Sequence, residues 1–278
     1  MTTTTQTTVE SRRHPGWLWL TAPIVALMAV ASAAGVFVDS VYAKESASWA
    51  AQGVGQDIVN LILVCPALAV SAYGAGKGSL RAELVWMGLL IYVVYSYVLY
   101  ALFVHFNALF LPHVAVLGLS GYALCGALAT VDRERFDDSF DRGQRPKAAS
   151  IYLMISGASF GLLWLADIVG ATVSGAAPAM VAELGMPVNP IHVRDLAFVL
   201  PGMILMSRLL WKRRLTGFLL AVPLMRFAAV MGTAIVAMSR VMAARGLPGL
   251  GGMEIVMAMM VMISLALTYR FLAQMSDP

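Results

Sequence analysis

An arginine lies deep inside a long apolar run in the second half of this 278-residue chain. Arg226 follows Leu215, the start of the run, by about eleven residues, or roughly 16 Å along a helix that rises about 1.5 Å per residue. Near the centre of a bilayer a charged side chain costs roughly 2.5–3.5 kcal/mol on insertion scales, so Arg226 must face other helices and find an anion. Asp167 is the expected partner by depth. The pair is either a structural clamp between two helices or a cation that binds an anionic group of a substrate.

Two aspartates stand at the start of two further apolar segments. Asp57 and Asp195 can each stabilise a helix N-terminus, by capping or through the helix dipole. Alternatively, they line an outer cavity together with Asp39 and Glu254, which we expect at a similar depth. Asn60 follows Asp57 by about one helical turn, so both side chains fall on one face and can line one wall.

The segments that begin at these aspartates each carry a proline inside the apolar run, Pro66 and Pro201. Proline removes a backbone donor, so we expect each helix to bend or break nearby. Proline-interrupted segments at matching places in two halves of a membrane protein indicate a binding site.

Three histidines lie toward the same side as the aspartates: His105, His113 and His192. Histidines with carboxylates can bind zinc or another transition metal, and a pair of them can ligate haem. No HxxxH or HExxH spacing supports either possibility, so we predict no metal and no cofactor. Interfacial histidines bonded to backbone or water are the commoner case.

The composition indicates which environment surrounds this chain. It is 60% hydrophobic and 12% charged, whereas soluble domains average about 25% charged residues. Such a chain cannot cover itself with polar surface, so lipid must surround it. The net charge of +4 does not indicate nucleic-acid binding, because the basic residues lie in short loops between apolar runs, where they set topology. The two cysteines form no CxxC motif.

The apolar residues form eight segments long enough to cross a bilayer as helices, which takes about 20 residues each. The sequence therefore predicts an all-α, polytopic membrane helical bundle of about eight transmembrane helices. The segments lie near Trp17–Asp39, Gln56–Gly74, Leu80–Phe103, Ala108–Ala129, Ile151–Val173, His192–Trp211, Leu215–Met238 and Gly251–Ala273.

A charged loop divides the chain into two parts. Residues 131–150 carry mixed charges and are predicted to be a cytoplasmic linker between a first four-helix half, 17–130, and a second, 151–273. Residues 1–16 form a Thr-rich terminus that we expect to be disordered and cytoplasmic, and residues 274–278 form a cytoplasmic tail.

Matching spacings predict that the two halves are a tandem repeat. Asp57 and Asp195, and likewise Lys77 and Lys212, are separated by nearly equal lengths of chain. Because each half has an even number of spans, both halves would have the same orientation.

The distribution of basic residues predicts the orientation. Most of the 19 Lys and Arg residues fall in the loops of one side, whereas the other side has only Lys44, Arg194, Arg240 and Arg245. Because cytoplasmic loops are enriched in Lys and Arg, both termini should be cytoplasmic, in a multi-pass protein of the cell (inner) membrane.

Five short stretches share one further property. They are Gly78–Arg81, Tyr92–Tyr97, Phe106–Leu111, Gly118–Ser120 and Asp195–Pro201. Together they resemble an uncharacterised family of bacterial multi-pass membrane proteins, and the resemblance covers roughly residues 56–128 and 192–238. It implies a membrane fold and transfers no catalytic residue.

These features favour transport or sensing of a small anionic solute at an outward-facing polar site between the halves. In this hypothesis Arg226 holds the anionic group, Asp167 neutralises it when the site is empty, and Asp57 and Asp195 line the entrance with Asn60. The alternatives are a membrane-embedded metal or haem redox subunit or enzyme, and an accessory subunit of a membrane complex. The expected partner is the lipid bilayer, with no nucleic acid, and the sequence identifies no protein partner.

Overall fold

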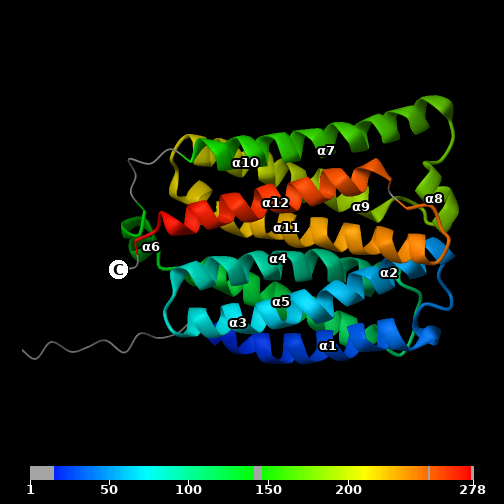
Figure 1. Cartoon of the computed structure of the whole chain (residues 1–278), viewed down its shortest axis with the longest axis horizontal. Helices are drawn as coiled ribbons and strands as arrows, with labels where there is room; N and C mark the ends of the chain where they lie inside the picture. The colour runs from blue at the N-terminus through cyan, green and yellow to red at the C-terminus, as the bar shows by residue number, and fades with distance from the viewer. Residues whose placement is uncertain (1–15, 141–145, 250, 277–278) are drawn as a thin grey trace, which may run out of the picture.

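A computed structural model describes residues 16–140, 146–249 and 251–276, so most of the predicted N-terminal disordered segment lies outside the described residues. The described chain is helical, and apart from one isolated β-bridge between Phe140 and Met275 it contains no β pairing. The helices run side by side along one axis, as Figure 1 shows. This confirms the predicted all-α bundle.

Seven helices among the described residues are long and apolar enough to cross a membrane. Two of them combine several elements: η1 (Gly16–Leu20) with α1 (Thr21–Phe37), and α2 (Ala47–Val59) with η3 (Asn60–Val64) and α3 (Cys65–Gly76). The other five are α4 (Leu80–Phe103), α5 (Phe110–Thr130), α7 (Lys147–Ser174), α11 (Leu215–Ala244) and α12 (Gly252–Ala273).

The predicted eighth segment is also helical. It consists of α9 (Pro190–Arg194), η4 (Asp195–Val199) and α10 (Leu200–Trp211), which follow one another without a break and run along the bundle (Figure 1). It is not among the seven apolar helices, so the count of eight spans stays a prediction. Three short helices complete the described fold: η2 (Asp39–Val41), α6 (Arg133–Asp138) and α8 (Ala179–Leu184).

The two helical runs that contain Pro66 and Pro201 are each interrupted just before the proline, as predicted. The segments η3 and η4 are π-helical, and each leads into an α-helix whose second residue is the proline, Pro66 or Pro201. A proline within a helix leaves a carbonyl of the preceding turn without its donor. A π-helical turn is one way in which the chain accommodates this loss, and such turns are frequent at functional sites.

Helix α11 lies at the centre of the bundle and packs against helices on both sides. Its neighbours are α2 and α4 from the first part of the chain and α10 and α12 from the second. Two glycines permit close contact: a Cβ at Gly55 would lie 2.5 Å from the Met238 Cα, and a Cβ at Gly88 would lie 2.8 Å from the Pro223 carbonyl oxygen.

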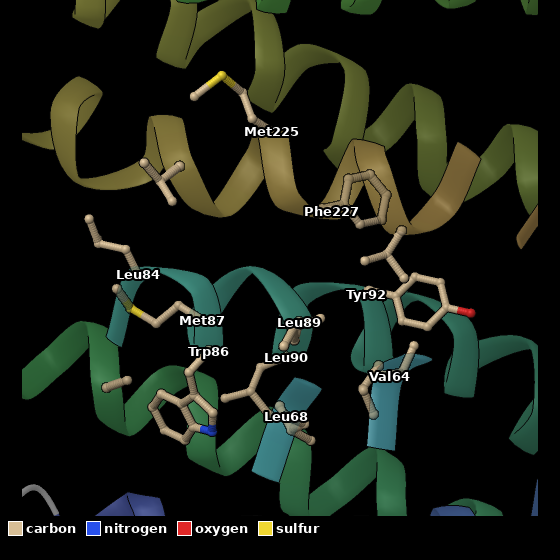
Figure 2. Close-up of a cluster of buried hydrophobic side chains, with 14 of the residues drawn as sticks. Val64, Leu68, Leu84, Trp86, Met87, Leu89, Leu90, Tyr92, Met225 and Phe227 are labelled. Atoms are coloured by element: carbon tan, nitrogen blue, oxygen red, sulfur yellow. The ribbon is translucent and has the colours of Figure 1, made fainter. Parts of the chain in front are cut away.

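The buried core includes side chains on more than one face of α4 and α11. Figure 2 shows Leu84 and Tyr92 on α4 and Met225 and Phe227 on α11, with the Met225 side chain pointing away from α4. All four side chains are buried. This packing fixes the position of α4 relative to α11, and thereby positions the tyrosines on α4 that bind the two aspartates.

The described part of the predicted linker is not simply a solvated loop. Phe136 in α6 is buried, and the ring of Phe140 lies 5.2 Å from those of both Phe218 and Phe271. The linker therefore begins as a short helix packed against one end of the bundle. This is also the end at which α1 begins and α12 ends (Figure 1).

Candidate functional site

A cavity of about 610 Å³ lies between the first and second parts of the bundle. Residues of α2 and α4, with Tyr42 and Val104 from the adjoining loops, form one side, and residues of α7, α8, α9, η4, α10, α11 and α12 form the rest. Most lining side chains are apolar, and aromatic rings and methionines are prominent among them: Trp49, Phe160, Trp164, Phe227, Met231, Met238, Met253, Met257 and Met260. Such a wall suits the apolar body of a small molecule.

Asp195 lies in the cavity wall and connects three helices. Asn189 caps α9 by accepting hydrogen bonds from the backbone of Ile191 and His192, which starts the short helix that presents Asp195 at the first position of η4. The Tyr95 hydroxyl on α4 donates to Oδ1 of Asp195 at 2.8 Å, and the Trp164 indole on α7 donates to Oδ2 at 3.0 Å. Both carboxylate oxygens therefore have protein donors.

Arg194, the neighbour of Asp195, lines the same cavity and keeps a donor without an acceptor. Its guanidinium carbon lies 3.3 Å from the centre of the Tyr95 ring, and its Nη1 donates to the Tyr95 carbonyl oxygen. Its Nε is buried and has no hydrogen-bond partner. Among the described residues no acid lies within 4 Å of the Arg194 guanidinium nitrogens, although the Asp195 carboxylate in the same wall lies near enough to attract it. An anionic ligand in the cavity could bind this cation directly.

Arg194 is the site residue that our interpretation of the sequence missed, because we assigned it to the outer loops as a topology residue. The signal that could have found it is its place beside Asp195, in a helix interrupted by Pro201. A basic residue next to an acid in such a helix is within reach of the binding site that the proline predicts.

Asp57 does not begin a helix. Helix α2 starts at Ala47, where the Ser46 side chain accepts from the Trp49 backbone, so Asp57 lies about ten residues into the helix. Its side chain is buried, and the residue is only 2% exposed. Asp195 likewise lies beyond the capped start of α9. The capping interpretation is therefore wrong for both aspartates, because each lies inside a helix and accepts hydrogen bonds from side chains.

Two tyrosines hold the Asp57 carboxylate. The Tyr42 hydroxyl donates to Oδ2, and the Tyr100 hydroxyl on α4 donates to Oδ1 at 2.9 Å. Both tyrosines line the cavity, whereas Asp57 does not. Asp57 therefore lies directly behind the cavity wall.

Tyr42 belongs to the loop before α2, outside the seven apolar helices. Tyr42 is buried, with 7% of its surface exposed. Burial first, and then the neighbouring Asp57 carboxylate, raise the pKa of the Tyr42 hydroxyl well above its ordinary value. Tyr42 therefore remains a protonated donor to Asp57 at neutral pH.

Asn60 lies one turn after Asp57, as predicted, and is fully buried. Its amide nitrogen donates to the Ser32 hydroxyl at 3.3 Å, and its oxygen accepts from the Tyr92 hydroxyl at 3.1 Å. Neither Asn60 nor Asp57 lines the cavity, and Asp195 is the one predicted acid that does. Of the polar groups that we predicted to line one wall, Asp195 therefore lies on the cavity surface, whereas Asp57 and Asn60 lie behind it.

The predicted ion pair between Arg226 and Asp167 is wrong. Asp167 has a half-exposed side chain, and its carboxylate lies 3.9 Å from the His192 ring nitrogen. Helix α7 begins at Lys147, so Asp167 lies about 20 residues, or roughly 30 Å, from that end of the bundle, against roughly 16 Å for Arg226 in α11. The two residues therefore differ in depth by roughly 14 Å, which is too much for direct contact.

Arg226 instead lines a second cavity, of about 570 Å³, between α3, α4, α11 and α12. The other lining residues are mostly apolar apart from Arg81, and they come from η3 and α3, the first half of α4, α11 and the middle and end of α12. The Nε of Arg226 is buried without a hydrogen-bond partner. This cavity is therefore nearer the end of the bundle that carries α6, and the cavity at Arg194 is nearer the opposite end. We call them the inner and outer cavities.

The three candidate histidines are not brought together. The His105 ring lies 3.1 Å from the Glu45 carboxylate. The His113 ring packs against the Tyr100 ring on α4, and the His192 ring packs against Trp164 on α7. In the described parts of the chain no group of three or more His, Cys, Asp or Glu residues could hold a metal ion.

Comparison of this chain with models of protein families, with curated proteins and with solved structures gave no match. Its function must therefore be inferred from the two cavities and the contacts of the residues that line them.

Proposed function

We propose that this chain is an inner-membrane carrier that moves a small organic anion with an apolar, preferably aromatic, body. The observation that carries the proposal is the outer cavity, in which the buried Arg194 keeps an unpartnered Nε in an aromatic and methionine-rich wall. The apolar wall would bind the body of the solute, and the guanidinium would bind its anionic group.

Two cavities, each with an arginine, support transport rather than sensing. Arg194 lines the outer cavity, and Arg226 lines the inner cavity together with Arg81. Arg194 and Arg226 each keep a buried Nε without an acceptor. They involve different residues of α11: Phe227 and Met231 line the outer cavity, whereas Arg226 and Val230 line the inner one. A carrier needs one such position accessible from each side of the membrane, and Arg226 would receive the anion on the inner side.

We further propose that the carrier consists of two tandem four-helix halves with eight spans. The two π-helical segments support this, because each begins six positions before its proline, at Asn60 in the first part and at Asp195 in the second. Each of these two residues also accepts a hydrogen bond from a tyrosine hydroxyl of α4. Matching interruptions of this kind are a feature of transporters built from repeats.

An anthracene sulfonate is a suitable probe, because it combines an aromatic body with a permanent negative charge. Trp49 and Trp164 line the outer cavity, so binding should transfer excitation energy from tryptophan to the probe. With the protein in lipid nanodiscs, Arg194→Met should weaken saturable binding by roughly 10- to 150-fold, because a hydrogen bond to a charged group contributes about 1.5–3 kcal/mol.

Arg208→Met is the matched control, because Arg208 is exposed on the same helical run and should leave binding unchanged. Arg194→Lys should retain part of the affinity, since the charge remains. Equal binding by wild type and Arg194→Met would show that the anion is not held at Arg194 and would refute the proposed site.

The proposed orientation puts α6 and both termini in the cytoplasm. Glu134 in α6 and Ser40 in the first loop at the opposite end are both exposed. In a chain whose Cys65 and Cys125 are replaced by alanine, an impermeant thiol reagent added to intact cells should label Ser40→Cys and not Glu134→Cys. After the cells are opened, both should be labelled. The reverse pattern in intact cells would invert the orientation.

A further inference from the structure

Asp57 is a buried carboxylate inside a membrane-spanning helix. Both of its oxygens accept from tyrosine hydroxyls, and among the described residues no Lys or Arg lies within ion-pair distance. An ionisable group at such a position is a functional hypothesis by default, because keeping it buried is costly. The question is which ion it binds.

We propose that Asp57 is a proton-binding site, and that its protonation is coupled to binding of the anion in the outer cavity. The proposal deepens the proposed function and rests on it for the coupling. A proton is the cation that fits, because the side chains around the carboxylate are neutral hydroxyl and amide groups: those of Tyr42, Tyr100, Ser32 and Asn60. Among the described residues no group of His, Cys, Asp or Glu side chains could hold a metal ion there.

The surroundings of Asp57 are built closely around it. A Cβ at Gly35 on α1 would lie 1.9 Å from Oδ2 of Asp57, and a Cβ at Gly53 would lie 2.8 Å from the Tyr42 ring. Glycine at both positions therefore lets the carboxylate and the tyrosine approach the backbone of α1 and α2. This space admits the Asp57 side chain and leaves no room for a larger group.

The other titratable groups near Asp57 are neutral side chains or a weak base. Tyr97 and Tyr92 on α4 and Cys65 at the start of α3 are buried, and the His113 ring on α5 lies 5.1 Å from the Tyr100 ring. None of them forms an ion pair with Asp57. A proton on the carboxylate is therefore the direct way to neutralise it.

Tyr42 and Tyr100 connect the proton site with the cavity. Each donates its hydroxyl hydrogen to Asp57, and each also lines the cavity wall. When Asp57 takes a proton, the new carboxyl O–H can donate to one tyrosine oxygen, and that tyrosine can turn its own hydrogen toward an anion in the cavity. Proton binding and anion binding then favour each other, and the coupling must be reciprocal.

Infrared spectroscopy tests the proton site without any ligand. Among the carboxylic-acid C=O bands of the wild-type protein in nanodiscs that disappear as the pH is raised, one should be absent from Asp57→Asn. Asp138→Asn, in the exposed part of α6, is the matched control and should retain the band. No such band in wild type, or an unchanged band in Asp57→Asn, would overturn the proposal.

A second pair of variants applies if Asp57→Asn does not fold. Tyr42→Phe and Tyr100→Phe each remove one donor to the ionised carboxylate, so the band should persist to higher pH in both. If neither variant changes the pH at which half of the band has disappeared, the band belongs to another acid and the proposal is overturned.

The coupling is tested with the anthracene sulfonate, whose charge does not change with pH. Wild type should bind it roughly tenfold more tightly at low pH than at high pH, and Asp57→Asn should lose most of that difference, leaving the part that the Asp195 carboxylate in the cavity wall contributes. The same pH dependence in both proteins would overturn the coupling. If wild type shows the infrared band but binds no sulfonate, the proton site stands and the proposed anion site fails.

Discussion

Replacing Gly55 with alanine should separate α2 from α11 and lower the thermal stability of the protein in detergent. The Cβ would lie 2.5 Å from the Met238 Cα and 2.7 Å from its backbone nitrogen. These are backbone atoms of a helix, which cannot rotate away as a side chain can, so the two helices must move apart. Overpacking of this kind costs about 1–3 kcal/mol, and we expect the upper end or more.

The control for this change is Gly118→Ala, on α5, where an added Cβ meets no atom within 4 Å. It adds the same methyl group and the same gain in helix propensity, about 1 kcal/mol in water. We expect an unchanged or slightly raised melting temperature for the control and a drop of several degrees for Gly55→Ala. Equal melting temperatures would show that α2 and α11 are not in contact at Gly55.

Replacing Gly35 with alanine should disrupt the buried Asp57 network. The new methyl group would coincide with Oδ2 of Asp57, at 1.9 Å, and would lie 3.0 Å from the Tyr42 hydroxyl. The carboxylate could yield only by leaving Tyr42 and Tyr100, which would leave two buried hydroxyls without their acceptor. Each lost partner costs about 1–3 kcal/mol, more where a charged group is involved, so this is a severe substitution.

A double variant separates this effect from a general defect of α1. In an Asp57→Ala background the carboxylate is absent, so Gly35→Ala should cost much less than it does in wild type. The difference between the two costs is the interaction energy of the two positions. Equal costs in both backgrounds would mean that Gly35 and Asp57 are not neighbours.

The sequence predicted the helical segments well because apolar runs and prolines act locally. It failed at the start of α2, which we placed at Gln56, because the first turns contain Ser48, Gln52 and Gln56 and lower the hydropathy there. The better signal was Ser46, whose side chain caps α2 and makes Ala47 the first residue. With that start, Asp57 falls inside the helix, where capping is impossible.

The candidate site was harder to predict because it depends on how helices pack. Depth along the sequence suggested that Arg226 and Asp167 were partners, but it carries no information about which face of a helix meets which neighbour. The partners of the tyrosines on α4 were equally hidden in the sequence. Their spacing did not reveal that Tyr95 donates to Asp195 and Tyr100 donates to Asp57. Such contacts between distant parts of the chain follow from tertiary structure.

The central position of α11 also determines the order in which the protein can be completed during synthesis. Helices α2 and α4 leave the ribosome long before α11, yet α11 covers the faces that contain Gly55 and Gly88. Until α11 is inserted, the small-residue faces of α2 and α4 lie in the membrane without their final partners, Met238 and Pro223 of α11. A chain that stops before Leu215 therefore remains an incomplete bundle, which is the kind of species that cellular proteases remove.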